Sequence, residues 1–192
     1  RAASERSRSR CVAFTRGFDF DLYLWELHHF REWLLEAWKG ASLPAPERAE
    51  LDWHFASIAR ALDAEPKGFT HRDYQSRNLM ALPGGELAVI DFQDALMGPR
   101  QYDLVALLRD SYVELPWDEV RHQLARIRPR LPDAPGEEEL ARRFDLLTLS
   151  RKGKDLARFV YAARERGAER YLRFAPATVR ALRAASVRAA AP

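Results

Sequence analysis

The feature that most constrains this chain is the polar segment at residues 71–78, which reads His-Arg-Asp-Tyr-Gln-Ser-Arg-Asn. It places Asp73 five residues before Asn78. A loop with this spacing can aim a carboxylate at a substrate hydroxyl while an amide oxygen reaches a metal ion on the phosphate side. The segment therefore indicates a phosphoryl-transfer loop, in which Asp73 orients the hydroxyl and accepts its proton.

Two short apolar runs, at residues 79–82 and 86–90, follow this loop and flank Pro83-Gly84-Gly85. That composition predicts two strands joined by a tight turn, a hairpin that would bring Asp91 back beside Asn78. Mg²⁺ gives up its waters reluctantly and usually binds one or two protein oxygens together with phosphate oxygens. We therefore predict that Asn78 and Asp91 bind Mg²⁺ next to the phosphates of ATP. The simpler interpretation is a solvated polar loop between two buried strands.

The loop at residues 71–78 and the sequence Ile90-Asp91-Phe92 resemble the aminoglycoside phosphotransferase-like kinases. This family includes choline, aminoglycoside and small-sugar kinases and shares the protein-kinase fold. The resemblance continues through residues 98–112 and an aromatic segment at 25–33, and covers about residues 20–182. Within the family the chain is most similar to bacterial kinases that phosphorylate the anomeric hydroxyl of N-acetylmuramate and N-acetylglucosamine in cell-wall recycling.

The resemblance also suggests residues that support the catalytic loop. An aspartate at the place of Asp103 typically bonds the backbone of that loop and holds it rigid. On the same grounds His71 is expected to lock the loop rather than to titrate in the reaction. Arg72 or Arg77 would add positive charge near the phosphates, although either could equally form a structural ion pair.

Three acidic residues are candidates for contact with the hydroxyls of a sugar substrate. Glu26 and Glu32 lie in a helix rich in aromatic residues, and Asp94 follows Asp91 in the metal loop. For the two glutamates, a solvated helix face is the competing interpretation.

The remaining sequence predicts a mainly α fold with a small β-hairpin (α+β). The first expected helix begins at Asp19 or Asp21 and ends near Trp38. Further helices are expected at about 47–64, 101–112 and 117–128, in a long segment from Glu137, and at residues 179–191. The charged run at residues 151–155 is expected to interrupt the long helix. A buried strand stub is expected at Phe69-Thr70 and a turn at Gly98-Pro99.

Kinases of this fold hold ATP beneath a glycine-rich loop on an amino-terminal sheet. Only Gly17 and Gly40 precede Gly68, and no Gly-x-Gly occurs before His71. The sequence therefore predicts the carboxy-terminal, catalytic and substrate lobe of a protein-kinase-like fold at residues 18–192, with the nucleotide-binding sheet absent. The missing amino-terminal lobe is then a candidate partner, and residues 1–17 are expected to form a disordered basic tail.

Composition narrows the function classes further. The chain has 192 residues, a formal net charge of +3 and a single cysteine, Cys11, which fits one domain in a reducing cytoplasm. Charged residues interrupt every apolar run, so no membrane span is expected. Three functions remain open: an ATP-dependent amino-sugar phosphotransferase, a catalytically incomplete substrate-binding module of the same family, and an arginine-rich nucleic-acid-binding protein. The third is the weakest, because no nucleic-acid-binding motif accompanies the charge.

Overall fold

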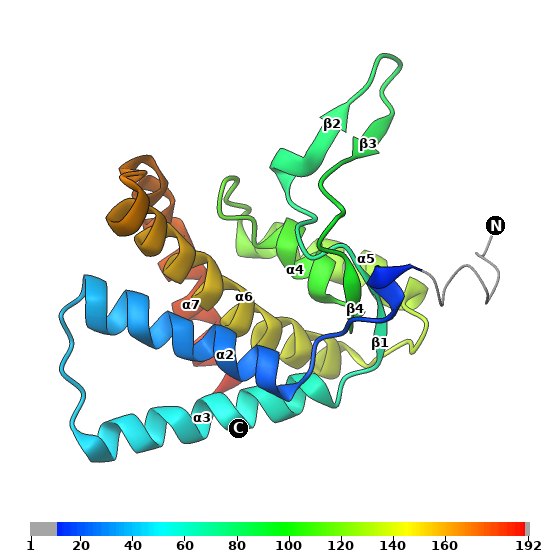
Figure 1. The fold of residues 1–192 in the computed structure, drawn as a ribbon. Helices are drawn as coiled ribbons and strands as arrows, with labels where there is room; N and C mark the ends of the chain where they lie inside the picture. Colours follow the sequence, from blue (N-terminus) through cyan, green and yellow to red (C-terminus); the bar gives the residue numbers. More distant parts are fainter. Residues whose placement is uncertain (1–10, 191–192) are drawn as a thin grey trace.

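The computed structural model describes residues 11–190, and it is mostly helical with two small antiparallel sheets (Figure 1). In chain order the elements are η1 (Val12–Phe14), α2 (Phe20–Phe30), η2 (Arg31–Trp38), α3 (Ala45–Asp63), β1 (Lys67–Thr70), η3 (Ser76–Asn78), β2 (Leu79–Ala81), β3 (Leu87–Val89), β4 (Leu96–Pro99), α4 (Tyr102–Leu108), α5 (Trp117–Ile127), η4 (Arg128–Arg130), α6 (Glu137–Arg166), η5 (Glu169–Phe174) and α7 (Ala175–Ala189). The α+β class predicted from the sequence is therefore confirmed. Within residues 11–190, no helix combines the length and the apolar character that crossing a membrane requires.

The fold is built around α6, which crosses the middle of the molecule in Figure 1 and packs against α7, α2, η2, α4 and α3. Leu140, Phe144 and Leu147, which the periodicity predicted to point inward, are all buried in the main core. A helix that contacts so many neighbours fixes their relative positions. The side chains of α6 can therefore reach the 71–78 loop from a rigid base.

The predicted interruption of this helix at residues 151–155 is wrong, because α6 is continuous over 30 residues. Arg151, Lys152 and Lys154 lie inside the protein and are paired there with acidic and hydroxyl groups. At Gly153 a Cβ would lie 3.4 Å from Phe30, which is ordinary van der Waals contact, so this glycine faces the end of α2 inside the helix packing. The charged run with its internal glycine therefore belongs to the buried part of α6 and does not break the helix.

The aromatic helix begins and ends where the sequence predicted. The Asp19 carboxylate accepts a hydrogen bond of 2.8 Å from the amide of Leu22 and so caps α2. The helix continues through η2, whose turns are of the wider π type, and Gly40 follows with a φ of +65°. The left-handed φ is the conformation in which glycine commonly ends a helix.

The predicted hairpin is confirmed as β2–β3. Its residue pairs are Leu79 with Val89, Met80 with Ala88, and Ala81 with Leu87. Gly84 and Gly85 form the turn with φ values of +93° and +85°, which an L side chain rarely adopts. Figure 1 shows the hairpin projecting away from the helices, and its base returns the chain to Asn78, whose carbonyl accepts a hydrogen bond of 3.0 Å from the amide of Ile90.

A second sheet, β1–β4, replaces the predicted turn at Gly98-Pro99. Thr70 pairs with Leu96 and Gly68 with Gly98, so the strand stub before the 71–78 loop has a partner. Thr70 is buried as expected, but Phe69 is exposed. A Cβ on Gly98 would lie 2.9 Å from the Phe18 ring, so glycine is required for this close packing.

The segment before α2 is ordered from η1 onward, which differs from the tail predicted for residues 1–17. The amide of Phe18 donates to the carbonyl of Met97 (2.8 Å), and the amide of Met97 donates to the carbonyl of Arg16 (2.9 Å). These bonds attach the segment to β4. Residues 1–10 lie outside the described part of the chain. Two helices also differ in extent from the prediction, since α4 ends at Leu108 and α7 begins at Ala175.

Candidate active site

The 71–78 loop leaves β1 and is held first by Asp103, in the first turn of α4. The Asp103 carboxylate accepts hydrogen bonds from the amides of His71 (2.8 Å) and Arg72 (3.1 Å). These are the bonds that the family resemblance led us to expect. Burial raises the pKa of the Asp103 carboxyl, and the two amide hydrogen bonds only partly offset that shift. The first part of the loop is therefore held by a partly buried carboxylate.

Arg72 has a φ of +72°, a left-handed backbone conformation that is uncommon for residues other than glycine. Its amide is held by Asp103, and its carbonyl accepts a hydrogen bond of 2.5 Å from the guanidinium of Arg151 on α6. Strained backbone of this kind persists where surrounding contacts determine it, and such positions cluster at functional sites. The conformation turns the chain immediately before Asp73.

A second anchor, Asp110, was not predicted from the sequence. Its carboxylate accepts hydrogen bonds from the amides of Ser76 (2.7 Å) and Tyr112 (2.8 Å). Asp110 follows α4, seven residues after Asp103, so one anchor lies in the first turn of this short helix and the other lies just after its end. The only sequence signal was an acidic residue at the predicted end of the helix that follows the metal loop.

The three residues predicted to carry the chemistry lie together. The side-chain amide of Asn78 donates to the carbonyl of Asp73 (2.8 Å) and to the carboxylate of Asp91 (3.3 Å). Asp91 has a φ of +71° and is also bonded by the side-chain amide of Gln93 (2.9 Å). The hairpin therefore returns the acidic residue to the asparagine, as its length predicted.

The oxygen atoms at this place fit Mg²⁺. The amide nitrogen of Asn78 is occupied by two acceptors, one of which is the Asp91 carboxylate, so the Asn78 amide oxygen remains free to bind a metal ion near that carboxylate. Across residues 11–190 no group of three or more Asp, Glu, His or Cys side chains is arranged to hold a metal ion. A pair of oxygen ligands completed by phosphate oxygens and water suits Mg²⁺, which rarely occupies an all-protein cage.

Arg151 extends from α6 to contact Asp73. Its guanidinium lies 3.5 Å from the Asp73 carboxylate and 3.3 Å from the hydroxyl of Tyr102, and the side chain is 1% exposed. Burial lowers the pKa of Arg151, but Asp155, Tyr102 and Asp73 outweigh burial, and the pKa lies above its ordinary value. A permanent positive charge therefore fixes the position of the Asp73 carboxylate.

A buried ionic cluster supports this arginine. The ammonium of Lys152 lies 2.5 Å from the Asp155 carboxylate and 2.9 Å from the hydroxyl of Ser111. Burial alone would raise the pKa of Asp155, but Lys152, Arg151 and Lys154 hold it well below its usual range. The charged sequence of residues 151–155 predicted an interruption of the helix and gave no signal that these residues contact the 71–78 loop.

Glu26 belongs to the same cluster, which contradicts the predicted contact with a sugar hydroxyl. Its side chain is 0% exposed, and its carboxylate lies 3.5 Å from both the guanidinium of Arg72 and the ammonium of Lys154. The glutamate faces inward because Tyr23 and Leu27 on the same turns of α2 are buried. It neutralises buried cations and has no surface to offer a ligand.

The two arginines of the loop have partners other than Asn78 and Asp91. Arg72 is paired with Glu26 and lies over the Phe18 ring, so the structural ion pair is the interpretation that the geometry supports. The Arg77 guanidinium lies 3.7 Å from the centroid of Tyr112, a cation–π contact. His71 is buried, and within residues 11–190 neither ring nitrogen has a hydrogen-bond partner.

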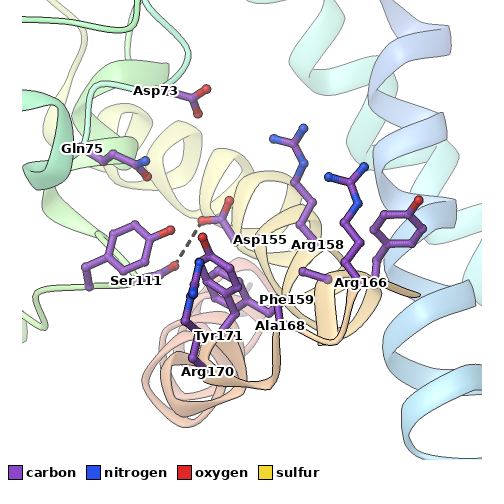
Figure 2. Close-up of a pocket in the computed structure, with 13 residues that line it drawn as sticks. Asp73, Gln75, Ser111, Asp155, Arg158, Phe159, Arg166, Ala168, Arg170 and Tyr171 are labelled. Carbon is purple, nitrogen blue, oxygen red and sulfur yellow. Dashed lines mark hydrogen bonds between the residues drawn. The ribbon is translucent and has the colours of Figure 1, made fainter. Parts of the chain in front are cut away.

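A cavity of about 520 Å³ opens beside Asp73, between the 71–78 loop, α6 and η5 (Figure 2). Its lining residues are Asp73, Gln75, Ser111, Tyr112, Asp155, Arg158, Phe159, Tyr161, Ala162, Arg166, Ala168, Arg170 and Tyr171. This volume suits a small-molecule ligand. Glu32, which lies 3.5 Å from the ring of His29, and the exposed Asp94 are both absent from this lining.

Comparison with known proteins identifies the family to which the chain is similar. The model of a family described as "Phosphotransferase enzyme family" matches residues 12–141. A protein of Neisseria meningitidis serogroup B, named N-acetylmuramate/N-acetylglucosamine kinase, is 41% identical over 102 residues, which are 53% of this chain and 30% of that protein.

Two further relatives carry the same name. The protein of Pseudomonas aeruginosa is 33% identical over 85% of this chain and 49% of its own length. That of Pseudomonas putida is 32% identical over 81% of this chain and 47% of its own length. The chain spans about half the length of these Pseudomonas relatives and a smaller share of the Neisseria protein.

Proposed function

The chain belongs to the phosphotransferase enzyme family, and from that premise we propose that it is the catalytic and substrate lobe of an ATP-dependent kinase with the protein-kinase fold. The acceptor is a hydroxyl of an amino sugar such as N-acetylmuramate or N-acetylglucosamine. The names of the relatives support this acceptor class, because each is a kinase of these two sugars.

The observation that carries the proposal is the meeting of Asp73 and Asn78, on the anchored 71–78 loop, with Asp91, which the β2–β3 hairpin returns to Asn78. Asn78 bridges the other two residues through its side-chain amide. Phosphoryl transfer requires little covalent chemistry from the protein and relies on positioning and charge. Two aspartate anchors and a buried arginine supply that positioning.

In the proposed reaction Asp73 binds the acceptor hydroxyl at the edge of the cavity. The hydroxyl oxygen bonds to the γ-phosphorus of ATP as the bond from that phosphorus to the bridging oxygen breaks, and ADP leaves. Asp73 takes the hydroxyl proton late in this step. Arg151 holds the Asp73 carboxylate in place throughout, since it bonds both the side chain of Asp73 and the carbonyl of Arg72.

Asn78 and Asp91 are the residues that would hold Mg²⁺. The ion, when bound, neutralises negative charge on the phosphates. Asp73 lines the cavity, whereas Asn78 and Asp91 do not. We therefore place the acceptor in the cavity beside Asp73 and the phosphates next to Asn78 and Asp91, outside the cavity lining.

Product formation tests the proposal. The chain is incubated with Mg-ATP and, in turn, N-acetylmuramate, N-acetylglucosamine, choline and an aminoglycoside, and mass spectrometry detects the phosphorylated product. We expect a phosphorylated amino sugar that is lost in Asp73→Asn. Product from choline or the aminoglycoside alone would refute the acceptor class. A folded chain that binds the amino sugars and forms no product would instead support the substrate-binding module.

A further inference from the structure

One face of the carboxy-terminal part of α6 forms a wall of the cavity. Asp155, Phe159, Ala162 and Arg166 follow each other at spacings of three or four residues, which places them on the same side of the helix. All four line the cavity together with Arg158. In Figure 2 the side chains of Arg158 and Arg166 extend from the helix in the same direction.

Three arginines on this wall and the adjoining turn carry charge that no carboxylate balances. Arg158, Arg166 and Arg170 are exposed and line the cavity. Within residues 11–190 none of them forms an ion pair with a carboxylate; Arg166 lies over the Tyr161 ring and Arg170 over the Tyr171 ring. The aromatic rings hold the guanidinium groups of Arg166 and Arg170 near the cavity without neutralising them.

The acidic groups of the cavity are already paired. Asp73 lies 3.5 Å from Arg151, and Asp155 lies 2.5 Å from Lys152. Glu165 and Glu169 are neighbours of the arginines in sequence but do not line the cavity. The free charge on the cavity wall is therefore positive, at a place that is adjacent to the proposed acceptor hydroxyl.

We propose that Arg158, Arg166 and Arg170 recognise a carboxylate on the acceptor, so that the site prefers an amino sugar acid to the same sugar without the acid. A guanidinium presents donors in a fixed fork that matches a carboxylate, and hydrogen bonds of this charged kind are stronger than neutral ones. The inference rests on the proposed function. It specifies that the acceptor carries a negative charge, and it names the residues that bind this charge.

Binding of two matched sugars tests this inference without requiring turnover. N-acetylmuramate and N-acetylglucosamine differ by a lactyl ether that carries the carboxylate, and isothermal titration calorimetry gives a Kd for each with the whole chain. We expect N-acetylmuramate to bind about tenfold more tightly at low salt, because hydrogen bonds to a charged group commonly strengthen binding by about this factor. The preference should shrink as ionic strength rises.

Variants assign the preference to these residues. Arg158→Gln and Arg166→Gln should each weaken N-acetylmuramate binding about three- to tenfold and leave N-acetylglucosamine binding unchanged. Arg166→Lys should retain part of the preference, because it keeps the charge and loses the fork. Arg130→Gln removes the same charge from an exposed arginine that does not line the cavity, and should change neither Kd.

The outcomes separate this inference from the proposed function. Equal Kd values for the two sugars in the wild type would overturn the inference and leave an amino-sugar acceptor standing. Equal losses on both sugars in the arginine variants would also overturn it, since that pattern reports a structural role. If neither sugar binds the folded chain, both this inference and the amino-sugar acceptor are refuted.

Discussion

Replacing Glu26 with glutamine isolates the contribution of the buried ionic cluster. The substitution keeps the shape of the side chain and removes its charge, which leaves Arg72 and Lys154 without a carboxylate that lies 3.5 Å from each. Because Glu26 is buried, it has no contact with a ligand. We therefore expect a loss of stability that does not depend on the presence of sugar.

The magnitude follows from these contacts. At an effective dielectric constant of about 20, two unit charges at this separation attract each other by about 5 kcal/mol. The cost of burying the charges offsets much of this attraction, and the Arg72 side chain is 22% exposed, so solvent screens its share. Removing one partner of a buried ion pair typically costs about 3–5 kcal/mol. We expect a loss in that range and a fall in Tm of roughly 10 °C.

Urea unfolding followed by circular dichroism measures the change, and Glu32→Gln is the matched control. The Glu32 side chain is 62% exposed, so the same substitution there should alter the free energy of unfolding by no more than about 0.5 kcal/mol. A Glu26→Gln variant within about 1 kcal/mol of the wild type would refute the assignment of Glu26 to the ionic cluster.

Three further predictions follow from other parts of the fold. Gly98→Ala should lower stability by about 1–3 kcal/mol in urea unfolding, because its Cβ would lie 2.9 Å from the buried Phe18 ring; an unchanged unfolding midpoint would contradict the packing. Asp103→Ala leaves two loop amides without their acceptor, which should cost about 1–3 kcal/mol in thermal unfolding and speed amide hydrogen exchange in the loop relative to α7. Since neighbouring cations lower the folded pKa of Asp155, its contribution is complete above the unfolded pKa of about 3.9 and is lost as pH falls through the folded value. Acid unfolding of Asp155→Asn should therefore depend less on pH below about pH 4 than that of the wild type.

Local patterns in the sequence were sufficient for the loop and the hairpin. The spacing from Asp73 to Asn78 and the glycine turn at residues 83–85 are features of adjacent residues, and they determine how the chain returns to Asp91. Helix boundaries with a local cause, such as the Asp19 cap, were predicted equally well. These parts depend on short-range geometry that one sequence displays.

Pairing between distant segments was not predictable in the same way. Strands β1 and β4 are four residues each and lie far apart in sequence, so neither carries a periodic pattern that would identify the other. The charged run at residues 151–155 looks solvated until Glu26 and Ser111 are placed beside it. The partners that offset the cost of burying these charges come from other parts of the chain, and the hydropathy of the segment does not indicate which residues they are.

The arginines of the cavity illustrate the same limit at the candidate site. Arg158 and Arg166 are ordinary surface residues of a basic helix in the sequence, whereas Asp73 stands out through its motif. Only the fold places both kinds of residue on one cavity. Sequence reasoning thus reached the side of the site that carries the proposed chemistry and missed the side that would select the acceptor.

Turnover and sugar binding in Asp73→Asn, each compared with the wild type, test the proposed role of Asp73. Loss of a positioned base ordinarily slows the reaction about 10²-fold or more. We expect a loss of this size in the rate of phosphorylated-sugar formation with Mg-ATP, while the Kd for the sugar stays within about threefold of the wild-type value, because asparagine keeps most of the hydrogen-bonding shape of aspartate. A variant that retains turnover within about tenfold of the wild type would contradict the role assigned to Asp73.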